Sequence, residues 1–371
     1  MDDDRLRQAR EEIADVDREM ARLFQRRMEA ARVIADYKRE RGLPILDASQ
    51  ERVVIERDLA YIEEDELRGL YVQFLTHLMD LSKTRQRRLM GGMRVAYSGV
   101  EGAFAHIAAR RVFPDAETVA CADFQAAYEA VERGDCDVCV LPVENSYAGE
   151  VGQVTDLMFN GTLYVTGMYA LPVTHHLLGV PGATLDGIRR VVSHPQALSQ
   201  CAGFIRRHGL ETQQASNTAR AAQSVIQAGD RATAAIASIE TARLYGLSVL
   251  AQGVNESGLN STRFAVFSRA ENRRVPAQAA GFMLLFTVNH TAGALAQAVS
   301  AIGRHGFNMR VLRSRPMRDL PWRYYFFAEI EGDDRGEAGQ AMLAALKAHC
   351  HSLKLVGRFG PEIVLKEAEE A

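Results

Sequence analysis

The stretch Asn260-Ser261-Thr262-Arg263-Phe264 places a hydroxyl group next to a guanidinium. It follows a glycine-rich turn and leads into the apolar run Ala265-Val266-Phe267, which predicts a strand. At the mouth of a strand, Thr262 is a candidate proton donor and Arg263 a candidate anion clamp. The pentapeptide alone also fits ordinary strand residues and a solvated arginine, so its role depends on its neighbours in the fold.

A second set of charged residues lies on one long predicted helix near the N-terminus. Arg27 and Lys38 are eleven positions apart, close to three full turns, so they share one face about 16 Å apart. Arg10 lies another ~25 Å along the helix. It could reach the same pocket only from a second, antiparallel chain.

Two pairs at i, i+4 spacing accompany these cations. Asp47 and Glu51 fall on a second predicted helix, and Ser82 and Gln86 fall on a third, each pair on one face. A pocket of cations, two acids, a hydroxyl and an amide suits a dicarboxylate that carries a hydroxyl group.

Other polar residues follow predicted strands directly. Glu144-Asn145-Ser146 comes after Leu141-Pro142-Val143, and Ser193-His194-Pro195-Gln196 comes after Val191-Val192. Each group alone could be a helix cap or a turn. Their repeated position at the ends of strands instead favours the lining of a cleft, where His194 is a candidate general acid or base.

Three kinds of element must position these residues. The first ninety residues predict helices over 5–41, from Asp47, and over 66–89. After Gly91-Gly92, strands and helices alternate up to residue 270, which predicts a two-lobed α/β domain. A polar linker, 269–278, precedes a strand-helix-strand-strand-helix-strand pattern, which predicts an α+β, ferredoxin-like domain.

The composition of the 371-residue chain, with 47% hydrophobic and 25% charged residues, predicts two or three globular domains. A net charge of -3 gives no overall field to attract nucleic acid or an anionic membrane, so a small-molecule ligand is expected. No apolar run approaches the roughly 18 residues of a membrane span, and the acidic N-terminus is unlike a signal peptide. We therefore expect a cytoplasmic protein.

Metal and disulfide chemistry is not expected. Five cysteines in a long chain make no disulfide framework, which fits a reducing compartment. Cys136 and Cys139 lie in a predicted strand and face opposite sides, so they are interpreted as buried small residues. His175 and His176 diverge in the same way, and no Cys or acid completes a metal site.

The first ninety residues resemble the all-helical chorismate mutase family, an intertwined dimer. The resemblance rests on Arg10, Arg27, Lys38, Leu43-Pro44-Ile45-Leu46-Asp47, Glu51 and Met79-Asp80-Leu81-Ser82 with Gln86. It implies that Arg10 of the partner subunit, Arg27 and Lys38 hold the substrate carboxylates. Lys38 and Gln86 would bind the breaking ether oxygen, and Asp47 and Glu51 the hydroxyl. Gln50 replaces the family's usual Arg, and a lost guanidinium could weaken substrate binding.

Residues 93–270 resemble the prephenate dehydratase family, which has a two-lobed fold like that of periplasmic binding proteins. The motifs are Gly99-x-x-Gly102-x-Phe104, Leu141 to Gly149, Ser193 to Cys201 and Thr262-Arg263-Phe264. The resemblance implies that Thr262 helps to protonate the departing ring hydroxyl. Asn145, Ser193 and Gln200 would position the substrate and Arg263 would bind a carboxylate, without a metal or organic cofactor.

Residues 279–366 resemble the amino-acid-binding ACT domain of such enzymes. The resemblance rests on Gly293-Ala294-Leu295 and Ser314-Arg315-Pro316, with Pro321-Trp322 beyond them. It implies that phenylalanine binds at a dimer interface and inhibits the enzyme. Ala296 and Arg313 depart from the family pattern, which has Val and Glu there, so the strength of inhibition stays open.

Together the three resemblances imply the bifunctional P-protein family of phenylalanine biosynthesis, with domains at 1–90, 93–270 and 279–366. Such a chain would rearrange chorismate to prephenate and then convert prephenate to phenylpyruvate as a homodimer or higher homo-oligomer. Three alternatives stay open: a degenerate mutase domain that only dimerises, arogenate as the preferred dehydratase substrate, and a non-enzymatic solute sensor.

Overall fold

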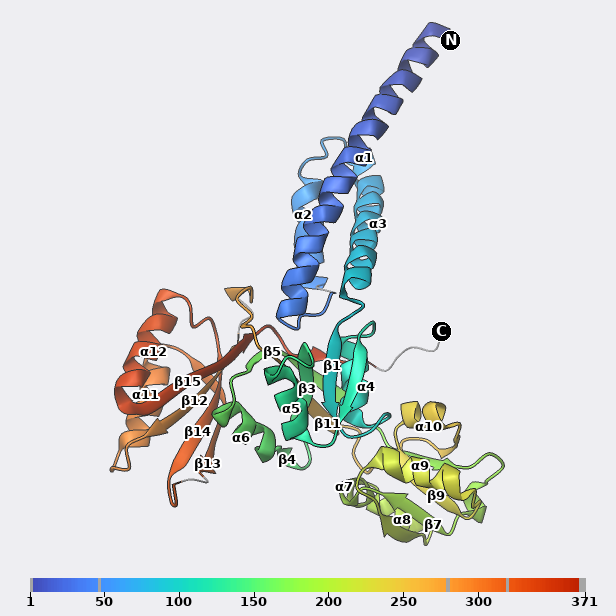
Figure 1. The fold of residues 1–371 in the computed structure, drawn as a ribbon, viewed down its shortest axis with the longest axis vertical. Coiled ribbons are helices and arrows are strands. Elements are labelled where there is room, and N and C mark those ends of the chain that lie inside the picture. The colour runs from blue at the N-terminus through green and yellow to red at the C-terminus, as the bar shows by residue number, and fades with distance from the viewer. Residues whose placement is uncertain (1–2, 46–47, 278–280, 318–319, 367–371) are drawn as a thin grey trace. The chain divides into compact units, whose positions relative to one another are not determined.

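The computed structural model describes residues 3–45, 48–277, 281–317 and 320–366 (Figure 1). The chain divides into two compact units. One contains residues 1–93 with 115–117, and the other contains residues 94–114 and 118–371. Within the described residues, no helix is both long and apolar enough to cross a membrane.

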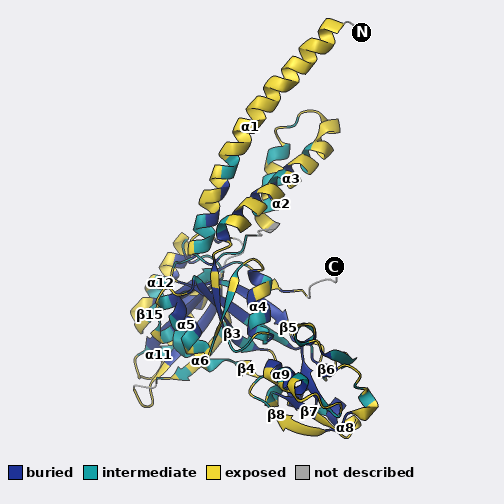
Figure 2. Ribbon diagram, turned by 45° about the vertical axis from the view of Figure 1, so that its right-hand side comes forward, coloured by how far each residue is buried: buried dark blue, intermediate teal, exposed yellow. Residues whose placement is uncertain are grey.

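Three helices form the first unit: α1 (Asp3–Glu40), α2 (Ala48–Leu59) and α3 (Asp65–Met90). Neither Gly nor Pro interrupts α1, which explains its length. Ala31 and Ala35 on α1 are buried, and so are Leu75 and Met79 on α3. Residues 3–26 of α1 are exposed, as Figure 2 shows, so this unit alone leaves most of its longest helix without a packing partner.

The second unit begins with the first lobe of a two-lobed α/β region. Its elements, in chain order, are β1 (Arg94–Ser98), α4 (Phe104–Val112), β2 (Glu117–Cys121), α5 (Phe124–Glu132), β3 (Val138–Asn145), β4 (Gly149–Glu150), α6 (Gly152–Asn160) and β5 (Tyr164–Pro172). Strand β11 (Ser261–Ser268) returns to this lobe and lies antiparallel between β3 and β5. Phe264 and Phe267 of β11 are buried, which anchors the strand in the core.

The second lobe is built on a separate sheet in the order β10-β6-β9-β7-β8. Its elements are β6 (His176–Gly179), the short 3-10 helix η1 (Leu185–Gly187), β7 (Arg190–Ser193), α7 (Pro195–Gln200), α8 (Ala202–Arg207), β8 (Glu211–Gln214), α9 (Thr218–Ala228), β9 (Thr233–Ala237), α10 (Ile239–Tyr245) and β10 (Ser248–Ala251). The chain crosses between lobes twice, after β5 and after β10. The predicted two-lobed α/β region is confirmed.

Residues 281–364 form a βαββαβ arrangement followed by a short strand. The elements are β12 (Gly281–Val288), α11 (Ala294–Arg304), β13 (Asn308–Pro316), β14 (Tyr324–Glu331), α12 (Glu337–His349), β15 (Cys350–Phe359) and β16 (Ile363–Val364). Its antiparallel strands lie in the order β13-β14-β12-β15, with the apolar faces of α11 and α12 packed on buried Phe282, Leu284 and Phe286.

Strand β15 joins this arrangement to the first lobe. Gly357 pairs with Val165 of β5, so the C-terminal strands and the strands of the first lobe form one eleven-stranded sheet among the described residues. A Cβ atom at position 357 would overlap the Val165 carbonyl oxygen, a clash that only glycine avoids. The junction therefore depends on one residue without a side chain.

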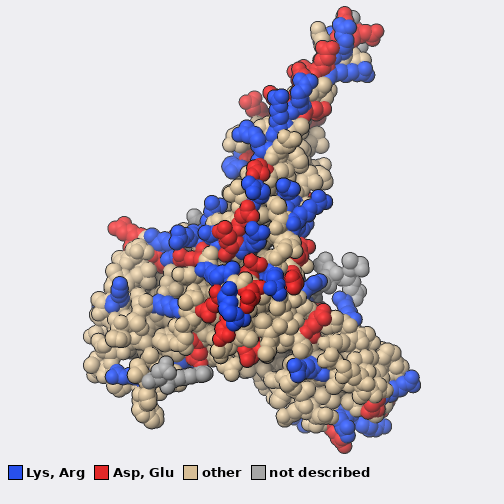
Figure 3. All heavy atoms as spheres, in the orientation of Figure 1, with Lys and Arg blue, Asp and Glu red and all other residues tan. Residues whose placement is uncertain are grey.

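The element prediction fails at a few places. The sequence predicts one helix over 196–208, but the structure has two short helices there, because Cys201 leaves the helical conformation between them with φ -110° and ψ 13°. Strand β8 was not expected, since Glu-Thr-Gln-Gln is exposed and has no apolar alternation. On the face drawn in Figure 3, basic and acidic side chains are interspersed, as the net charge of -3 predicts.

Candidate active sites

In the helical unit, helix α3 presents Ser82 to Arg27 of α1. The Arg27 guanidinium donates to the Ser82 hydroxyl and, at 3.1 Å, to the Leu78 carbonyl oxygen. Burial lowers the pKa of Arg27 from its usual value, with the charges of Asp58 and Tyr71 acting in the opposite direction. The structure therefore brings together a cation and a hydroxyl that were predicted from separate helices.

The other predicted residues of this unit are less completely assembled. Lys38 donates to the Ile45 carbonyl oxygen, and Glu51 pairs with Lys83 at 3.0 Å, a contact the sequence did not indicate. Asp47 lies outside the described residues. Arg10 is exposed on the unpacked part of α1, so a single chain does not bring it to the pocket.

Gln86 is buried, at 7% exposure, one helical turn beyond Ser82. Its Oε1 atom has no hydrogen-bond partner among the described residues. Because buried polar atoms in proteins are nearly always bonded, this amide marks a place for a ligand atom. The O and N ends of an amide are assigned from their neighbours, so the same position suits a donor as well as an acceptor.

In the α/β region, two backbone groups fix the orientation of Asn145 at the end of β3. Its Oδ1 atom accepts from the N-H groups of Tyr147 at 3.0 Å and Ala148 at 2.9 Å. The Gln196 side chain, from α7 of the second lobe, donates to the same oxygen at 3.1 Å. The Asn145 Nδ2 group must therefore point the other way and act as the donor.

The Asn145 Nδ2 group faces the opening pentapeptide of β11. It donates to Thr262 Oγ1 at 2.9 Å, to Asn260 Oδ1 at 3.1 Å and to the Ser261 carbonyl oxygen at 3.2 Å. Since Thr262 Oγ1 accepts this bond, its own hydroxyl proton can go to a substrate. No acceptor for that proton is recorded among the residues that the structure describes.

The orientation of the Asn145 amide also determines which atoms donate and accept between Asn260, Gln200 and His175. With Asn260 Oδ1 occupied, Asn260 Nδ2 donates to Gln200 Oε1 at 3.0 Å. His175 Nε2 lies 3.0 Å from the same oxygen and so carries the proton. The Gln200 Nε2 and His175 Nδ1 atoms are buried without a partner among the described residues.

Ser193 and His194 stand apart from this network. Ser193 is fully buried at the end of β7 and donates to the Ile236 carbonyl oxygen at 2.6 Å. His194 caps α7, since its Nδ1 atom accepts from the Gln196 N-H at 3.2 Å. Nδ1 therefore has a structural role in the cap, and no contact of the ring with Thr262 is recorded in the described part of the chain.

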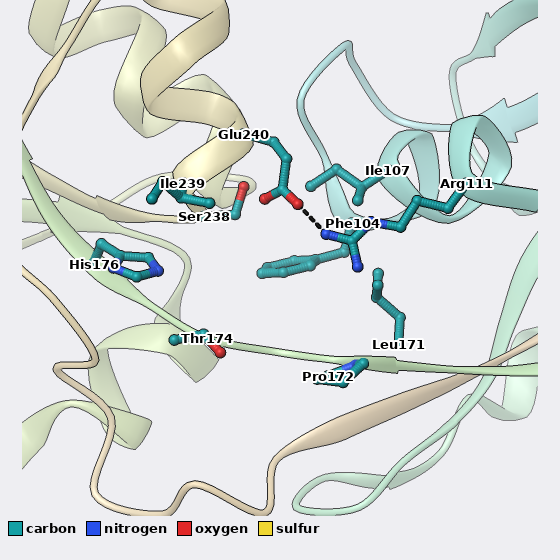
Figure 4. A pocket seen from close by; sticks show the side chains of 10 residues that line it. All are labelled: Phe104, Ile107, Arg111, Leu171, Pro172, Thr174, His176, Ser238, Ile239 and Glu240. Carbon is teal, nitrogen blue, oxygen red and sulfur yellow. Dashed lines mark hydrogen bonds and ion pairs between the residues drawn. The ribbon is translucent and has the colours of Figure 1, made fainter. Parts of the chain in front are cut away.

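The two lobes meet beside this network. Thr241 donates to the Gly102 carbonyl oxygen at 3.0 Å and Tyr245 to that of Glu101 at 3.1 Å. Figure 4 shows a pocket between α4 and α10, across which Arg111 pairs with Glu240. None of the predicted site residues lines that pocket, so we place the chemistry at Asn145 and Thr262 instead.

The glycines before α4 do not present free N-H groups. Gly99 donates to the Cys121 carbonyl oxygen at 2.9 Å, and Gly102 donates to His106 Nδ1 at 3.1 Å. A Gly-x-x-Gly turn before a helix can present free N-H groups to an anion, but these two groups form no such cradle in this structure.

Arg263, expected to bind a substrate carboxylate, lies among acidic side chains of the protein itself. Its guanidinium contacts the carboxylates of Glu144, Glu329 and Glu362. Successive strand residues point to opposite faces, so Arg263 is directed away from Thr262 and the Asn145 amide. Burial pulls the pKa of Arg263 down, but the bonds to Glu329 and Glu362 outweigh it and raise that pKa.

The two C-terminal motifs lie on α11 and β13. Gly293 precedes α11 with φ 80°, a left-handed conformation that favours glycine, and Ala294 and Leu295 open the helix. Ser314, Arg315 and Pro316 end β13, an edge strand. Arg315 is committed to Asp156 of α6, at 2.9 and 3.0 Å, and to the Tyr325 hydroxyl at 3.0 Å.

Among the described residues, no group of three or more His, Cys, Asp or Glu could hold a metal ion. Cys136 and Cys139 are buried free cysteines, as predicted. The sequence assigned no role at the site to Asn260, Gln196 or His175. Asn260 and Gln196 lie within quoted stretches, but only the register of β11 on β3 and the meeting of the lobes brings all three residues together.

Comparisons with known proteins match both parts of the chain. A family model described as prephenate dehydratase matches residues 95–272, and one described as chorismate mutase type II matches residues 9–87. The bifunctional chorismate mutase/prephenate dehydratase of Enterobacter agglomerans is 30% identical over 381 residues, covering 98% of each chain.

Two solved structures resemble a large part of this chain. One, named GqqA and described as a novel type of quorum quenching acylase, is 31% identical with a TM-score of 0.68, covering 72% of this chain and 98% of its own. The other is the prephenate dehydratase of Arthrobacter aurescens in complex with L-Phe. It is 25% identical with a TM-score of 0.67, covering 72% of this chain and 90% of its own.

The buried His175 gives a prediction about stability and pH. Burial lowers the pKa of His175 to about 4 in the folded chain, from the usual 6.5. As pH falls from 6.5, the unfolded chain binds a proton that the folded chain refuses, so stability falls by about 1.4 kcal/mol per pH unit. His175→Gln removes this contribution and keeps a donor for Gln200.

We expect denaturant unfolding of the wild type to show a larger loss of stability between pH 7 and pH 5 than the His175→Gln variant, by about 2 kcal/mol. Replacing the exposed His351 by Gln is the control and should leave the wild-type pH dependence in place. Equal losses in wild type and His175→Gln would contradict a depressed pKa at His175.

Proposed function

The chain belongs to the family of bifunctional chorismate mutase/prephenate dehydratases, and we propose which of its residues carry out each reaction. The enzyme rearranges chorismate to prephenate and then decarboxylates and dehydrates prephenate to phenylpyruvate, in the biosynthesis of phenylalanine. We assign residues 1–90 to the mutase, 93–270 to the dehydratase and 279–366 to a regulatory domain.

The dehydratase proposal rests on one observation, the bond from Asn145 Nδ2 to Thr262 Oγ1. It leaves the Thr262 proton free to be donated to the ring hydroxyl of prephenate as that group departs. The substrate carboxylate leaves as carbon dioxide, its electron pair enters the ring, and the hydroxyl leaves as water. Formation of the aromatic ring drives the reaction, so the protein mainly orients the substrate and assists the leaving group.

Substrate oxygens need donors other than Arg263. Gln200 Nε2 is buried and has no partner among the described residues, which makes it the donor we assign to a carboxylate or carbonyl oxygen of prephenate. Asn260 and His175 hold the oxygen end of that amide and so keep the nitrogen end free. Ser193 offers only acceptor lone pairs, because its proton goes to Ile236.

The similarity to a quorum quenching acylase raises hydrolysis of an N-acyl amide as a second candidate reaction. Acyl transfer by a hydroxyl needs a base within hydrogen-bond reach of it. Thr262 has a donor, Asn145, as its recorded neighbour, while His175 Nε2 is engaged by Gln200. The geometry therefore favours dehydration over acyl transfer.

For the mutase we propose a pocket shared between two chains. Arg27, Lys38, Ser82 and Gln86 come from one subunit and Arg10 of the partner subunit completes the carboxylate site. The rearrangement needs no nucleophile, since it follows from holding the folded conformer and placing cations against the oxygen on which charge develops. We assign Gln86 to that oxygen, with its amide turned so that the nitrogen donates from the position where Oε1 has no partner among the described residues.

The exposed face of α1 supports the dimer. Within residues 3–26, six large apolar residues are 40 to 60% exposed: Leu6, Ile13, Val16, Met20, Leu23 and Phe24. Leu6, Ile13 and Met20 repeat every seven residues, and so do Val16 and Leu23, which is the pattern of a coiled-coil seam. An apolar stripe of this length in a water-exposed helix marks an interface, and α1 of a second chain is its matching partner.

The regulatory assignment is drawn from the βαββαβ order and from the dehydratase that was solved with L-Phe. We propose that residues 279–366 form an ACT domain and that phenylalanine binds there. The left-handed Gly293 turn before α11, with Ala294 and Leu295, and the end of β13, Ser314 to Pro316, are the proposed contacts.

One prediction concerns the Thr262 hydroxyl. Thr262→Val keeps the shape of the side chain and removes the proton, so prephenate dehydration should fall by about 10²- to 10³-fold in kcat/KM. Thr262→Ser should keep a measurable fraction of the rate. Chorismate mutase activity of the same variants is the internal control and should not change.

Unaltered phenylpyruvate production by Thr262→Val would rule out the assigned role. The same preparations, assayed on arogenate and on an N-acyl amide, would show which substrate class the site prefers.

Another prediction tests the shared mutase pocket. Arg10→Ala and Lys38→Ala should each abolish most mutase activity, because each removes a cation from every pocket. When the two variants are co-expressed, mixed dimers contain one intact site, so about a quarter of the wild-type rate should return. Two Lys38→Ala chains co-expressed in the same way are the control. Failure of the mixture to regain activity would mean that Arg10 does not act across the dimer.

A third prediction for the enzyme concerns feedback. L-phenylalanine should lower the rate of phenylpyruvate formation from prephenate in the wild type. In Gly293→Ala the inhibition should weaken, because a side chain at φ 80° strains the turn by about 1 kcal/mol. Initial rates across a phenylalanine series measure this, with the uninhibited rate of each protein as reference. Identical inhibition curves would place the effector elsewhere.

A further inference from the structure

We infer that Arg263 is a positioning residue for the dehydration, acting by fixing the end of β11 on which Thr262 stands. The inference rests on the proposed role of Thr262. It assigns to Arg263 a place in the reaction other than binding a substrate carboxylate.

The pairing of β11 with β3 separates two faces. Thr262 is opposite Asn145 and Arg263 is opposite Glu144. The amide of Asn145 meets Thr262 on one face, and the carboxylate of Glu144 meets Arg263 at 3.1 Å on the other. Adjacent residues of both strands therefore form a polar contact on each side of the sheet.

On its own face, Arg263 is held by segments that are distant in sequence. Its Nη1 and Nη2 atoms donate to the two oxygens of Glu329, on β14, at 3.0 and 2.9 Å. Its Nε atom donates to Glu362, just before β16. Such a two-pronged contact restrains a guanidinium in angle as well as in distance.

The burial of Glu329 makes this contact hard to replace by water. Its side chain is 3% exposed, so its charge must be balanced by protein groups. Arg263 supplies the nearest cation, and Arg310 lies farther away at 3.8 Å. Removing the Arg263 guanidinium would leave a buried carboxylate to find a new partner, and the strand would shift as it did so.

Arg313, which departs from the family pattern, also takes part in this network. Its guanidinium binds Glu144, the same carboxylate that Arg263 contacts. Glu144 precedes Asn145 directly, so both residues of the Asn145-Thr262 contact have neighbours anchored in this network. The network thus ties the C-terminal strands to the two residues that orient the reacting hydroxyl.

The end of β11 needs such a restraint. The register of β11 on β3 shifts between Arg263 and Phe264, so the regular ladder is interrupted next to Thr262. A bulge re-aims side chains and leaves the ladder locally disrupted. The ion pairs of Arg263 act at this point, on the side of β3, while the pairing of β11 with β5 stays regular from Ser261 to Phe264.

The test is a double-mutant cycle with Arg263→Met and Glu329→Gln, measured in the full-length enzyme with prephenate. Each variant should lower kcat by about tenfold, since a small displacement of Thr262 harms the transition state. The KM for prephenate should change by less than about twofold. The double variant should be no worse than the poorer single variant, because both remove the same contact.

Matched changes at an exposed strand pair serve as the control. Arg190→Met and Glu211→Gln break an Arg-Glu contact of 3.3 Å between β7 and β8, with side chains 49% and 72% exposed, and should leave kcat and KM unchanged. Arg263→Lys keeps a charge and should regain part of the rate. If thermal unfolding shows that Arg263→Met does not fold, Arg263→Lys replaces it in the double-mutant cycle with Glu329→Gln.

A different pattern would overturn the inference. If Arg263 bound the substrate, Arg263→Met would raise KM by more than about tenfold while Glu329→Gln changed nothing. Unchanged kinetics in both variants, or additive losses, would also contradict it. A different result would refute only the role of Thr262. In that case Thr262→Val would keep full dehydratase activity, while the effects of Arg263→Met and Glu329→Gln on kcat would still be non-additive.

Discussion

Two backbone N-H groups, those of Tyr147 and Ala148, donate to one oxygen of Asn145, and the polarity of the dehydratase site follows from this pair of bonds. With the oxygen occupied, the amide nitrogen can only face Asn260 and Thr262. Each next amide is then oriented in turn, up to the free nitrogen of Gln200. A backbone turn therefore decides which side-chain atoms are left for a substrate, and no ionised side chain is needed for that order.

Strand β11 serves two purposes with adjacent residues. One face carries the hydroxyl group that we assign to prephenate dehydration, and the other face carries a guanidinium that binds three carboxylates. The C-terminal strands β13 and β14 reach the second face through Arg313 and Glu329. A rearrangement of those strands would thus be felt at the hydroxyl through a single peptide unit, without any contact between effector and substrate.

The mutase unit is built by a different rule. Its helices bury few side chains within one chain, and the long helix α1 exposes its apolar stripe to solvent. The rearrangement of chorismate needs oriented cations and no moving proton, so residues on rigid helices suffice. In our assignment the dehydratase donors come from both lobes, Thr262 from β11 and Gln200 from α7.

The sequence by itself determined the helices of the first unit, the two-lobed α/β region and the family of the enzyme. These follow from the spacing of apolar residues and from short motifs, both of which depend on residues close together in the sequence. The opposite directions of Thr262 and Arg263 were also within reach of the sequence, since strand residues face opposite sides in turn.

Only the tertiary structure decided which of the two faces meets the cleft. That depends on the register of β11 against β3, on the Gly357 junction that brings β15 beside β5, and on carboxylates such as Glu329 that lie 66 residues away from Arg263. It also assembled Asn260, Gln200 and His175 around one oxygen. Contacts of this kind join residues far apart in the chain, so they cannot be predicted from local sequence patterns.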